Sequence, residues 1–216
     1  YGSLKEYHLL ALLPSYLERR NSSLVFMVER FMAQTQSPSG FFLDDFNQLS
    51  RTLQALKKEG KKVLLIGVTF ALLDFASQYP DDYGGVIVIE TGGMKGRRRE
   101  MIRQEVHEFL MKNMNLSQVH SEYGMTELLS QFYAKADGIF QMNKFARIFL
   151  REVNDPFSMQ NFPKSGAVNV VDLANIHSCS FIATNDLGRI YLEEKKFEII
   201  GRMDNAEARG CNLMWT

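Results

Sequence analysis

The sequence has no excess of charge of either sign and no long apolar run. Its 25 Lys and Arg residues are balanced by 25 Asp and Glu residues in a chain of 216 residues. This balance excludes a global basic field that would hold nucleic acid or an anionic membrane surface. The longest apolar runs, such as VLLIGVTFALL, stop well short of the roughly 20 residues that a membrane span needs. We therefore expect no nucleic-acid partner and no membrane span.

Cysteine is scarce as well, with two residues in the whole chain. The N-terminus shows no basic-then-apolar signal pattern. Together these features predict free thiols in a reducing cytoplasm rather than a disulfide framework. With 45% hydrophobic residues, the chain can bury a sizeable core, as one large domain or two small ones.

The first part of the chain alternates between strand and helix patterns. YHLLALLPSYLE predicts a buried strand that stops at Pro14, and KKVLLIGV and GGVIVIE are near-continuous apolar runs around the helical pattern TFALLDFASQY. Such runs are typical of buried parallel strands joined by crossover helices. Residues 1–137 are therefore predicted to form an α/β layer with a mainly parallel sheet.

Further helices and one more strand complete this layer. NSSLVFMVERFMAQ and DDFNQLSRTLQALKKEG have capping residues followed by apolar residues at helical spacing, and Asp44 is expected to cap the second of these helices. RRREMIRQEVHEFLMKNM predicts another helix, and SQVHSEY predicts the strand that follows it.

The pattern changes in residues 138–216, which we predict to be a smaller, mostly β subdomain. ARIFLRE, GAVNVVDL, SFIATNDLGRIYL and KFEIIGRM are short β-patterned runs separated by turn residues. QTQSPSG and NDPFSMQNFPKSG are the stretches with a linker-like composition.

The loops at the carboxyl ends of the predicted strands are where a ligand would bind in such a sheet. In ETGGMKGRRRE, Gly92 and Gly93 have no Cβ atoms, so a flat ring or a phosphate can lie against the backbone. The alternative is an ordinary turn before a solvated basic helix end. The spacing matches neither the phosphate loop GxxxxGK[ST] nor the dinucleotide motif GxGxxG.

A second candidate lies in HSEYGMTELLSQFY, which has the pattern of a strand that runs into an amphipathic helix. Tyr123 can offer a ring face to a base, and Gly124 permits close approach. Thr126 can donate to a phosphoryl oxygen, and Glu127 can bind a hard cation such as magnesium. The alternative is that Thr126 and Glu127 cap the start of the helix.

Two loops near the C-terminal end supply further polar candidates. NDLGR places Asp186 before a glycine turn, and GRMDNAEARG brings Arg202, Asp204 and Arg209 into one loop after a strand. The Asp186 carboxylate can accept hydrogen bonds from two ribose hydroxyls, or it can form the turn.

The order of these fragments resembles the motif series of the acyl-adenylate-forming enzymes, which include acyl-CoA synthetases and firefly-type luciferases. Within that superfamily the chain is most similar to the acyl-protein synthetase family. The resemblance rests on ETGGMKGRRREM, SEYGMTELLSQFY, DLANIHSCSFIATNDLGR and GRMDNAEARGCNLM, and it covers most of the chain from YHLLALLPSYLE onward. It implies a partial adenylate-forming large domain.

The resemblance implies roles for several positions in binding ATP and magnesium. Gly92 and Gly93 would line the adenine, Tyr123 would stack on it, and Gly124 would leave room for it. Thr126 would contact the phosphate and Glu127 the magnesium ion. The ribose hydroxyls would bind Asp186, and the ribose or phosphate edge would bind Arg202.

Other implied roles lie toward the two ends of the chain. Asp204 falls at the superfamily's hinge, and Tyr16 would border the acid substrate. Cys211 would accept the acyl group, and the alternative is a small buried residue in a loop. Cys179, within a β-patterned run, is expected in the core. The family's Ser/Thr/Gly-rich phosphate loop is not found in the sequence, so a fragment of a longer protein is expected. The superfamily's small domain with a catalytic lysine is not found either, which is typical of the acyl-protein synthetases.

The implied reaction is ATP-dependent activation of a carboxylic acid, with a long-chain fatty acid as the expected substrate. The acyl group would pass from acyl-adenylate to a protein cysteine, and an acyl-accepting reductase or carrier protein is the expected partner. One alternative is an acyl-CoA-type ligase that passes the acyl group to a free thiol. Another is a non-catalytic nucleotide-binding module. The oligomeric state is not predicted.

Overall fold

The computed structural model describes residues 1–13, 22–92, 101–155, 157–159, 165–191 and 195–203. The chain divides into two compact units, with the boundary between Ser121 and Glu122. Each unit has its own arrangement of strands, and each is described separately below.

The first unit is a parallel sheet flanked by helices. Its strands are β1 (Tyr7–Leu12), β2 (Gln36–Phe41), β3 (Lys62–Val68), β4 (Ile87–Thr91) and the first half of β5 (His120–Tyr123), in the order β2-β1-β3-β4-β5. The last two residues of β5, Glu122 and Tyr123, belong to the second unit. Its helices are the 3₁₀ turn η1 (Leu4–Glu6), α1 (Ser23–Met32), α2 (Phe46–Lys58), α3 (Thr69–Gln78) and α4 (Arg103–Met114). Strand β1 pairs in parallel with β2 and β3, and β3 pairs in parallel with β4. The predicted α/β layer is confirmed.

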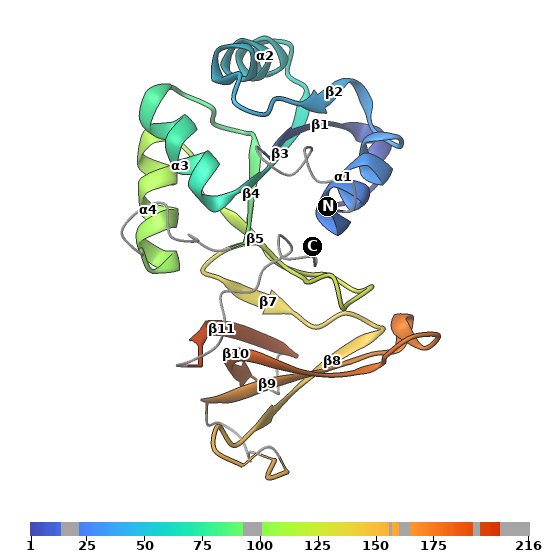
Figure 1. Ribbon diagram of the computed structural model, residues 1–216. Helices are drawn as coiled ribbons and strands as arrows, with labels where there is room; N and C mark the ends of the chain where they lie inside the picture. The colour runs from blue at the N-terminus through green and yellow to red at the C-terminus, as the bar shows by residue number, and fades with distance from the viewer. Residues whose placement is uncertain (14–21, 93–100, 156, 160–164, 192–194, 204–216) are drawn as a thin grey trace. The chain divides into compact units, whose positions relative to one another are not determined.

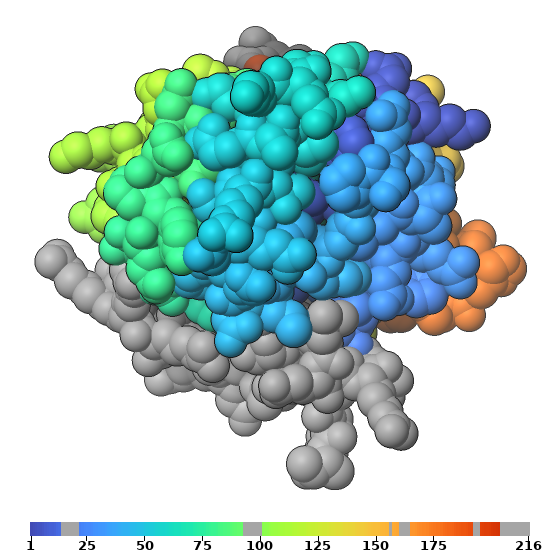
Figure 2. Space-filling view, turned by 90° about the horizontal axis from the view of Figure 1, so that it is seen from above, coloured from blue at the N-terminus to red at the C-terminus, as the bar shows by residue number. Residues whose placement is uncertain are grey.

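The strands of this sheet are buried on both faces, as their continuous apolar sequences predict. All six residues of β1 are buried, and so are the last six of β3. In Figure 1, α3 and α4 lie together on one side of the strands and α1 lies on the other. Seen from above, the exposed surface of the unit is formed largely by the chain from α1 to α3 (Figure 2).

The helices begin at side-chain caps. Ser22 accepts a hydrogen bond from the amide of Val25 at 3.3 Å and caps α1. The cap of α2 is Asp45, which accepts from the amide of Gln48 at 2.9 Å, so the prediction of Asp44 as the cap is wrong by one residue. Two adjacent aspartates carry the same local signal, and the sequence does not separate them.

One strand of the first unit was not predicted. The QSPSGF segment, expected to be linker-like, forms β2 and pairs with β1 at the edge of the sheet. Pro38 has no amide hydrogen to donate, and an edge strand is where a sheet tolerates proline. The residues of β2 are exposed or half-buried, so its sequence lacks the apolar pattern that would mark it as a strand.

The second unit is an antiparallel sheet, which confirms the predicted smaller, mostly β part. Its strands are β6 (Phe132–Ala134), β7 (Ile139–Gln141), β8 (Ala146–Arg151), β9 (Ser165–Asp172), β10 (Phe181–Tyr191) and β11 (Lys196–Arg202), in the order β6-β7-β11-β10-β9-β8. A 3₁₀ turn, η2 (Leu173–Asn175), follows β9. The pairs that join β8 to β9, β9 to β10, β10 to β11 and β11 to β7 are all antiparallel.

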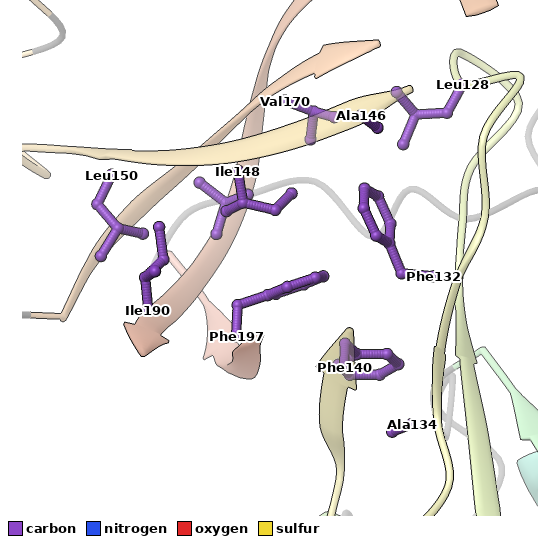
Figure 3. Packing of buried hydrophobic residues seen from close by; sticks show 11 residues of the cluster. Leu128, Phe132, Ala134, Phe140, Ala146, Ile148, Leu150, Val170, Ile190 and Phe197 are labelled. Carbon is purple, nitrogen blue, oxygen red and sulfur yellow. The ribbon is translucent and has the colours of Figure 1, made fainter. Parts of the chain in front are cut away.

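An aromatic and aliphatic core lies on one face of this sheet (Figure 3). Three phenylalanines, Phe132, Phe140 and Phe197, are almost completely buried. The Phe197 ring stacks on Phe140 with centroids 5.3 Å apart and meets Phe132 edge-on at 5.0 Å. These contacts are the preferred geometries of aromatic pairs, so the core gives the strands a rigid base.

The amphipathic helix expected after Tyr123 is absent. Residues 124–131, between β5 and β6, contain turns and no helix. The amide of Leu128 closes a turn on the carbonyl of Met125 at 3.1 Å, and the next two amides donate to Asp172. The alternative reading of Thr126 and Glu127 as helix caps is therefore wrong. None of the helices in the described ranges is long and apolar enough to span a bilayer.

Candidate functional site

Three of the predicted binding residues meet in the second unit around one carboxylate. Tyr123 donates its hydroxyl hydrogen bond to Oδ2 of Asp186 at 2.8 Å. Nε of Arg202 lies 3.4 Å from Oδ1 of the same residue. Asp186 and Arg202 face each other in the β10–β11 pairing, so the sheet register sets this contact.

The cluster of Tyr123, Asp186 and Arg202 is thus formed by residues of β5, β10 and β11, which are far apart in the sequence. The Asp186 side chain is 17% exposed, so the carboxylate is shielded but can be reached from solvent. A carboxylate has about four lone-pair sites, two on each oxygen. Tyr123 donates to Oδ2, and Arg202 forms an ion pair with Oδ1. Among the described residues these are the side chains that contact the carboxylate, so each oxygen has acceptor capacity for a further donor, as two neighbouring hydroxyl groups require.

The Tyr123 ring belongs to the aromatic core of the second unit. Its centroid lies 6.2 Å from that of Phe132, 5.9 Å from Phe140 and 6.0 Å from Phe197. Burial, together with the neighbouring carboxylate of Asp186, raises the pKa of Tyr123 well above its ordinary value. Tyr123 is therefore a neutral hydrogen-bond donor, and a base would have to stack on the side of the ring that faces away from the phenylalanines.

The turn that carries Thr126 and Glu127 is held from the end of β9. The Asp172 carboxylate accepts from the amides of Leu129 and Ser130, each at 2.9 Å, and from Oγ of Ser130 at 2.7 Å. Asn175 donates from Nδ2 to the carbonyl of Glu127 at 2.7 Å. The turn is thus fixed by two polar side chains of the segment DLAN, while Thr126 and Glu127 are themselves exposed.

Asp172 is completely buried. Burial on its own would raise the pKa of Asp172, but the hydroxyl of Ser130 and the amides of Ser130, Leu129 and Ala174 outweigh that effect and hold the pKa below its ordinary value. A buried carboxylate needs such donors to be tolerated. The hydrogen bonds that hold the turn therefore also favour the ionised form of the Asp172 carboxyl group.

Glu127 is the residue in this turn that fits a magnesium ion. Across the described residues there is no cluster of three or more His, Cys, Asp or Glu side chains that could hold a metal by themselves. Magnesium in nucleotide sites is commonly bound through one or two carboxylates together with substrate phosphates and water. An exposed single carboxylate on a fixed turn fits that mode and does not fit an all-protein cage.

In the first unit, the glycine turn after β4 has a conformation that favours glycine. Gly92 has a φ of +79°, in the left-handed region. Its carbonyl accepts a hydrogen bond from Oγ1 of Thr69 at 2.6 Å. The hydroxyl of Thr69, the first residue of α3, therefore fixes the start of the predicted adenine-lining loop.

A buried polar network that sequence reasoning missed lies behind this turn. Glu90 is 4% exposed, and its Oε2 lies 2.9 Å from Oγ1 of Thr69, whose single hydroxyl hydrogen it shares with the carbonyl of Gly92. Nε of Arg103 lies 3.4 Å from Oε1 of Glu90. Nε2 of His107 lies 3.7 Å from the same oxygen and 3.2 Å from Oγ of Ser121. Burial raises the pKa of Glu90, but His107, Arg103, Ser121 and Thr69 outweigh it and keep the pKa below its ordinary value.

The sequence did contain a signal for this network. Glu90 ends the apolar run GGVIVIE, where a charged residue inside a buried strand requires partners. Its partners come from α3, α4 and β5, so neither their identity nor their proximity follows from the sequence alone.

Five predicted residues, Gly93, Tyr16, Asp204, Arg209 and Cys211, lie outside the described residues. Cys179 is described, and the expectation that it lies in the core is wrong. It is an exposed free cysteine in the loop before β10, with Sγ 3.3 Å from the carbonyl of Phe181. The run IHSCSFIAT has the β pattern, but its strand begins only at Phe181.

Comparison with known families gives one match. Residues 17–216 match the family described as acyl-protein synthetase, LuxE. No curated protein matches the chain.

Solved structures show the same fold at low sequence identity. ATP-bound MatB from Rhodopseudomonas palustris is 14% identical, with a TM-score of 0.64 over 92% of this chain and 41% of MatB. A long-chain-fatty-acid-CoA ligase, FadD1 from Archaeoglobus fulgidus, is 13% identical, with a TM-score of 0.60 over 93% of this chain and 44% of that protein. A luciferase-like enzyme from the mealworm Zophobas morio is 16% identical, with a TM-score of 0.53 over 91% and 50%. The chain thus spans half or less of the length of these three structures.

The anchoring role of Asp172 predicts a specific dependence of stability on pH. Because the folded-state pKa lies below the unfolded value of about 3.9, the stabilisation is present above that value and is lost as pH falls through the folded pKa. We expect Asp172→Asn to lower the free energy of unfolding at pH 7 by about 1.5 to 3 kcal/mol, the contribution of a hydrogen bond to a charged group. The difference from wild type should shrink as pH falls below about 4.

Urea unfolding at pH 7 and at steps between about pH 5 and 3 measures this difference. Asp155→Asn is the matched control, since Asp155 also accepts from a backbone amide and a serine hydroxyl, but at the surface. It should change stability little. Equal stability of Asp172→Asn and wild type at pH 7 would contradict the anchoring role.

Proposed function

The chain belongs to the acyl-protein synthetase family LuxE, and from this membership we propose that it uses ATP to activate a carboxylic acid as acyl-adenylate. The observation that carries the proposal is the Asp186 carboxylate between Tyr123 and Arg202. Among the described residues, Tyr123 and Arg202 leave acceptor capacity on each oxygen of that carboxylate, as two ribose hydroxyls would require. This geometry and the family membership together support a nucleotide as the ligand.

The first step of the proposed reaction forms a phosphorus–oxygen bond. A carboxylate oxygen of the acid attacks the α-phosphorus of ATP, and the bond to the leaving pyrophosphate breaks. No proton needs to be removed from the ionised acid, so positioning and charge neutralisation supply most of the catalysis. Magnesium, when bound, would neutralise charge on the phosphates, with Glu127 as its proposed protein ligand.

The second step passes the acyl group to a thiol. A thiolate attacks the acyl carbonyl, the carbon–oxygen bond to AMP breaks, and a thioester forms. The family description, acyl-protein synthetase, supports a protein cysteine as the acceptor. We assign that role to Cys211, with a long-chain fatty acid as the substrate and an acyl-accepting reductase or carrier protein as the partner.

The other assigned roles follow the same proposal. Thr126 would donate to a phosphoryl oxygen from the turn held by Asp172, and Arg202 would bind the ribose or phosphate edge. Gly124 would permit close approach of the nucleotide beside Tyr123. The adenine-lining role of Gly92 and Gly93 and the acid-bordering role of Tyr16 stay predictions.

A second candidate is transfer of the acyl group to a free thiol such as coenzyme A. The similarity of fold to a long-chain-fatty-acid-CoA ligase favours it. The two functions share the adenylate and differ only in the acceptor. Protein-bound acyl label separates them.

Adenylate formation itself is tested by exchange of labelled pyrophosphate into ATP. In the full-length protein we expect exchange that requires both the fatty acid and magnesium. Glu127→Gln should fold normally, because the side chain is exposed, and should lower exchange roughly tenfold or more, since an amide is a poorer magnesium ligand than a carboxylate. Glu152→Gln, at another exposed position of the second unit, is the control.

The outcomes of this assay separate the functional classes. No acid-dependent exchange in the wild type would favour a nucleotide-binding module without catalysis. Full exchange in Glu127→Gln across a magnesium titration would remove Glu127 from the metal site.

Ribose binding by Asp186 predicts a selective loss of nucleotide affinity. Asp186→Ala should weaken binding of a nonhydrolysable acyl-adenylate mimic by roughly 1.5 to 3 kcal/mol, the contribution of a charge-assisted hydrogen bond. Binding of the fatty acid alone should not change. Calorimetric titration measures both, with Asn185→Ala as the control at the adjacent exposed position. Unchanged nucleotide affinity in Asp186→Ala would return Asp186 to the role of a turn former.

The acceptor cysteine is tested by trapping labelled acyl chains on the protein. We expect Cys211→Ser to keep pyrophosphate exchange but to lose the hydroxylamine-sensitive label, because serine does not form a thioester. Cys179→Ser is the matched control, since Cys179 is an exposed free thiol and should not carry the label. Label that persists in Cys211→Ser, or that disappears in Cys179→Ser, would overturn the assignment.

A further inference from the structure

Strand β10 contains a wide bulge at the position of Asp186. Ala183 pairs with Asn169 of β9, and Leu187 pairs with Ala167. The three residues 184–186 of β10 therefore lie opposite one residue of β9, Val168. A bulge of this kind interrupts the ladder, re-aims side chains and leaves backbone groups without their usual partners.

Two of the carbonyls at this bulge, those of Val168 and Thr184, accept hydrogen bonds from a buried arginine of the next strand but one. Arg151, the last residue of β8, is 7% exposed. Its NH1 donates to the carbonyl of Val168 at 3.1 Å and to Oδ1 of Asn169 at 2.9 Å. Its NH2 donates to the carbonyl of Thr184 at 2.8 Å. The guanidinium thus joins the two strands across the bulge.

Thr184 links this arginine to Asp186. Oγ1 of Thr184 donates to the carbonyl of Val168 at 2.9 Å and accepts from the amide of Asp186 at 3.1 Å. The carbonyl oxygen of Val168 therefore accepts hydrogen bonds from both Arg151 and Thr184. These contacts hold the backbone that leads into Asp186, from which the carboxylate projects.

The partners of Arg151 are unusual for a buried cation. Each acceptor that the described residues provide for its guanidinium is a neutral oxygen. Burial lowers the pKa of Arg151, because desolvation disfavours the charged form. An arginine suits it because the planar guanidinium offers several donors in a fixed fork, which lysine does not.

We propose that Arg151 is a positioning residue that sets the ribose specificity of the site through Thr184 and the Asp186 bulge. The inference rests on the proposed role of Asp186 in nucleotide binding. It extends that role to residues that would not touch the nucleotide. Arg151 lies on β8, two strands away from Asp186 on β10 in the same sheet (Figure 1).

The test compares the affinities of the full-length protein for ATP and for 2′,3′-dideoxy-ATP. The ratio of the two dissociation constants measures the contribution of the ribose hydroxyls and does not respond to a general loss of stability. In Arg151→Lys the preference for ATP should fall about tenfold, the order of one charge-assisted hydrogen bond. Arg147→Lys is the matched control, because Arg147 is also on β8 and donates to backbone carbonyls but lies away from the bulge.

A second pair of variants addresses the same bulge at Thr184, a neutral side chain, so that no charged group is altered. Thr184→Val removes the hydroxyl and keeps the shape of the side chain, whereas Thr184→Ser retains the hydroxyl. The preference for ATP should fall in Thr184→Val and be restored in Thr184→Ser. If Arg151→Lys does not fold, this pair decides the proposal.

A double-mutant cycle with Asp186→Ala separates failure of this inference from failure of the proposed function. If Arg151 acts through Asp186, Arg151→Lys should not change the ratio further in the Asp186→Ala background. A ratio that falls further in the double variant, or stays at the wild-type value in both Arg151→Lys and Thr184→Val, would overturn the inference. If Asp186→Ala itself leaves the ratio unchanged, the role of Asp186 in ribose binding fails, and this inference fails with it.

Discussion

The second unit depends on keeping buried polar groups paired where its strands end or bulge. The carboxylate of Asp172 is completely buried and takes two successive amides and a hydroxyl from the segment after β5. Because the amides of Leu129 and Ser130 donate to Asp172, the segment forms the turn of Thr126 and Glu127 instead of a helix. At the bulge, Arg151 donates hydrogen bonds to the buried carbonyls of Val168 and Thr184. In both places a polar side chain that is not proposed to contact the ligand holds the backbone that carries a proposed ligand-binding residue. Asp172 holds the turn of Thr126 and Glu127, and Arg151 holds the backbone that leads into Asp186.

Much of the framework could be predicted because its physical cause is local in the sequence. Continuous apolar runs such as VLLIGV report burial on both faces, and these became the parallel strands of the first unit. Alternating runs such as ARIFLR report burial on one face, and these became the antiparallel strands around the phenylalanine core. The choice of Tyr123, Asp186 and Arg202 also came from the sequence, through their place in ordered motifs, although only the β10–β11 pairing shows that Asp186 faces Arg202.

The features that were missed have causes that lie far away in the chain. Leu128, Leu129 and Phe132 have helical spacing, but Asp172, more than forty residues later, takes the amides that a helix would use. Strand β2 is polar and contains a proline, so only its pairing with β1 identifies it. The partners of Glu90 are spread over two helices and a strand. Intrinsic patterns report burial and capping, but they do not report which distant group satisfies a buried one.

The central claim is that the carboxylate of Asp186, aimed by the bulge, accepts both hydroxyls of a nucleotide ribose. A crystal structure of the full-length protein with a nonhydrolysable acyl-adenylate mimic tests it most directly. The account predicts each ribose hydroxyl within about 2.5 to 3.0 Å of one Asp186 oxygen, the range of an O–H···O hydrogen bond. It also predicts that Tyr123 and Arg202 keep their present contacts with the carboxylate. A ribose bound elsewhere, with Asp186 bonded only to Tyr123 and Arg202, would contradict the account.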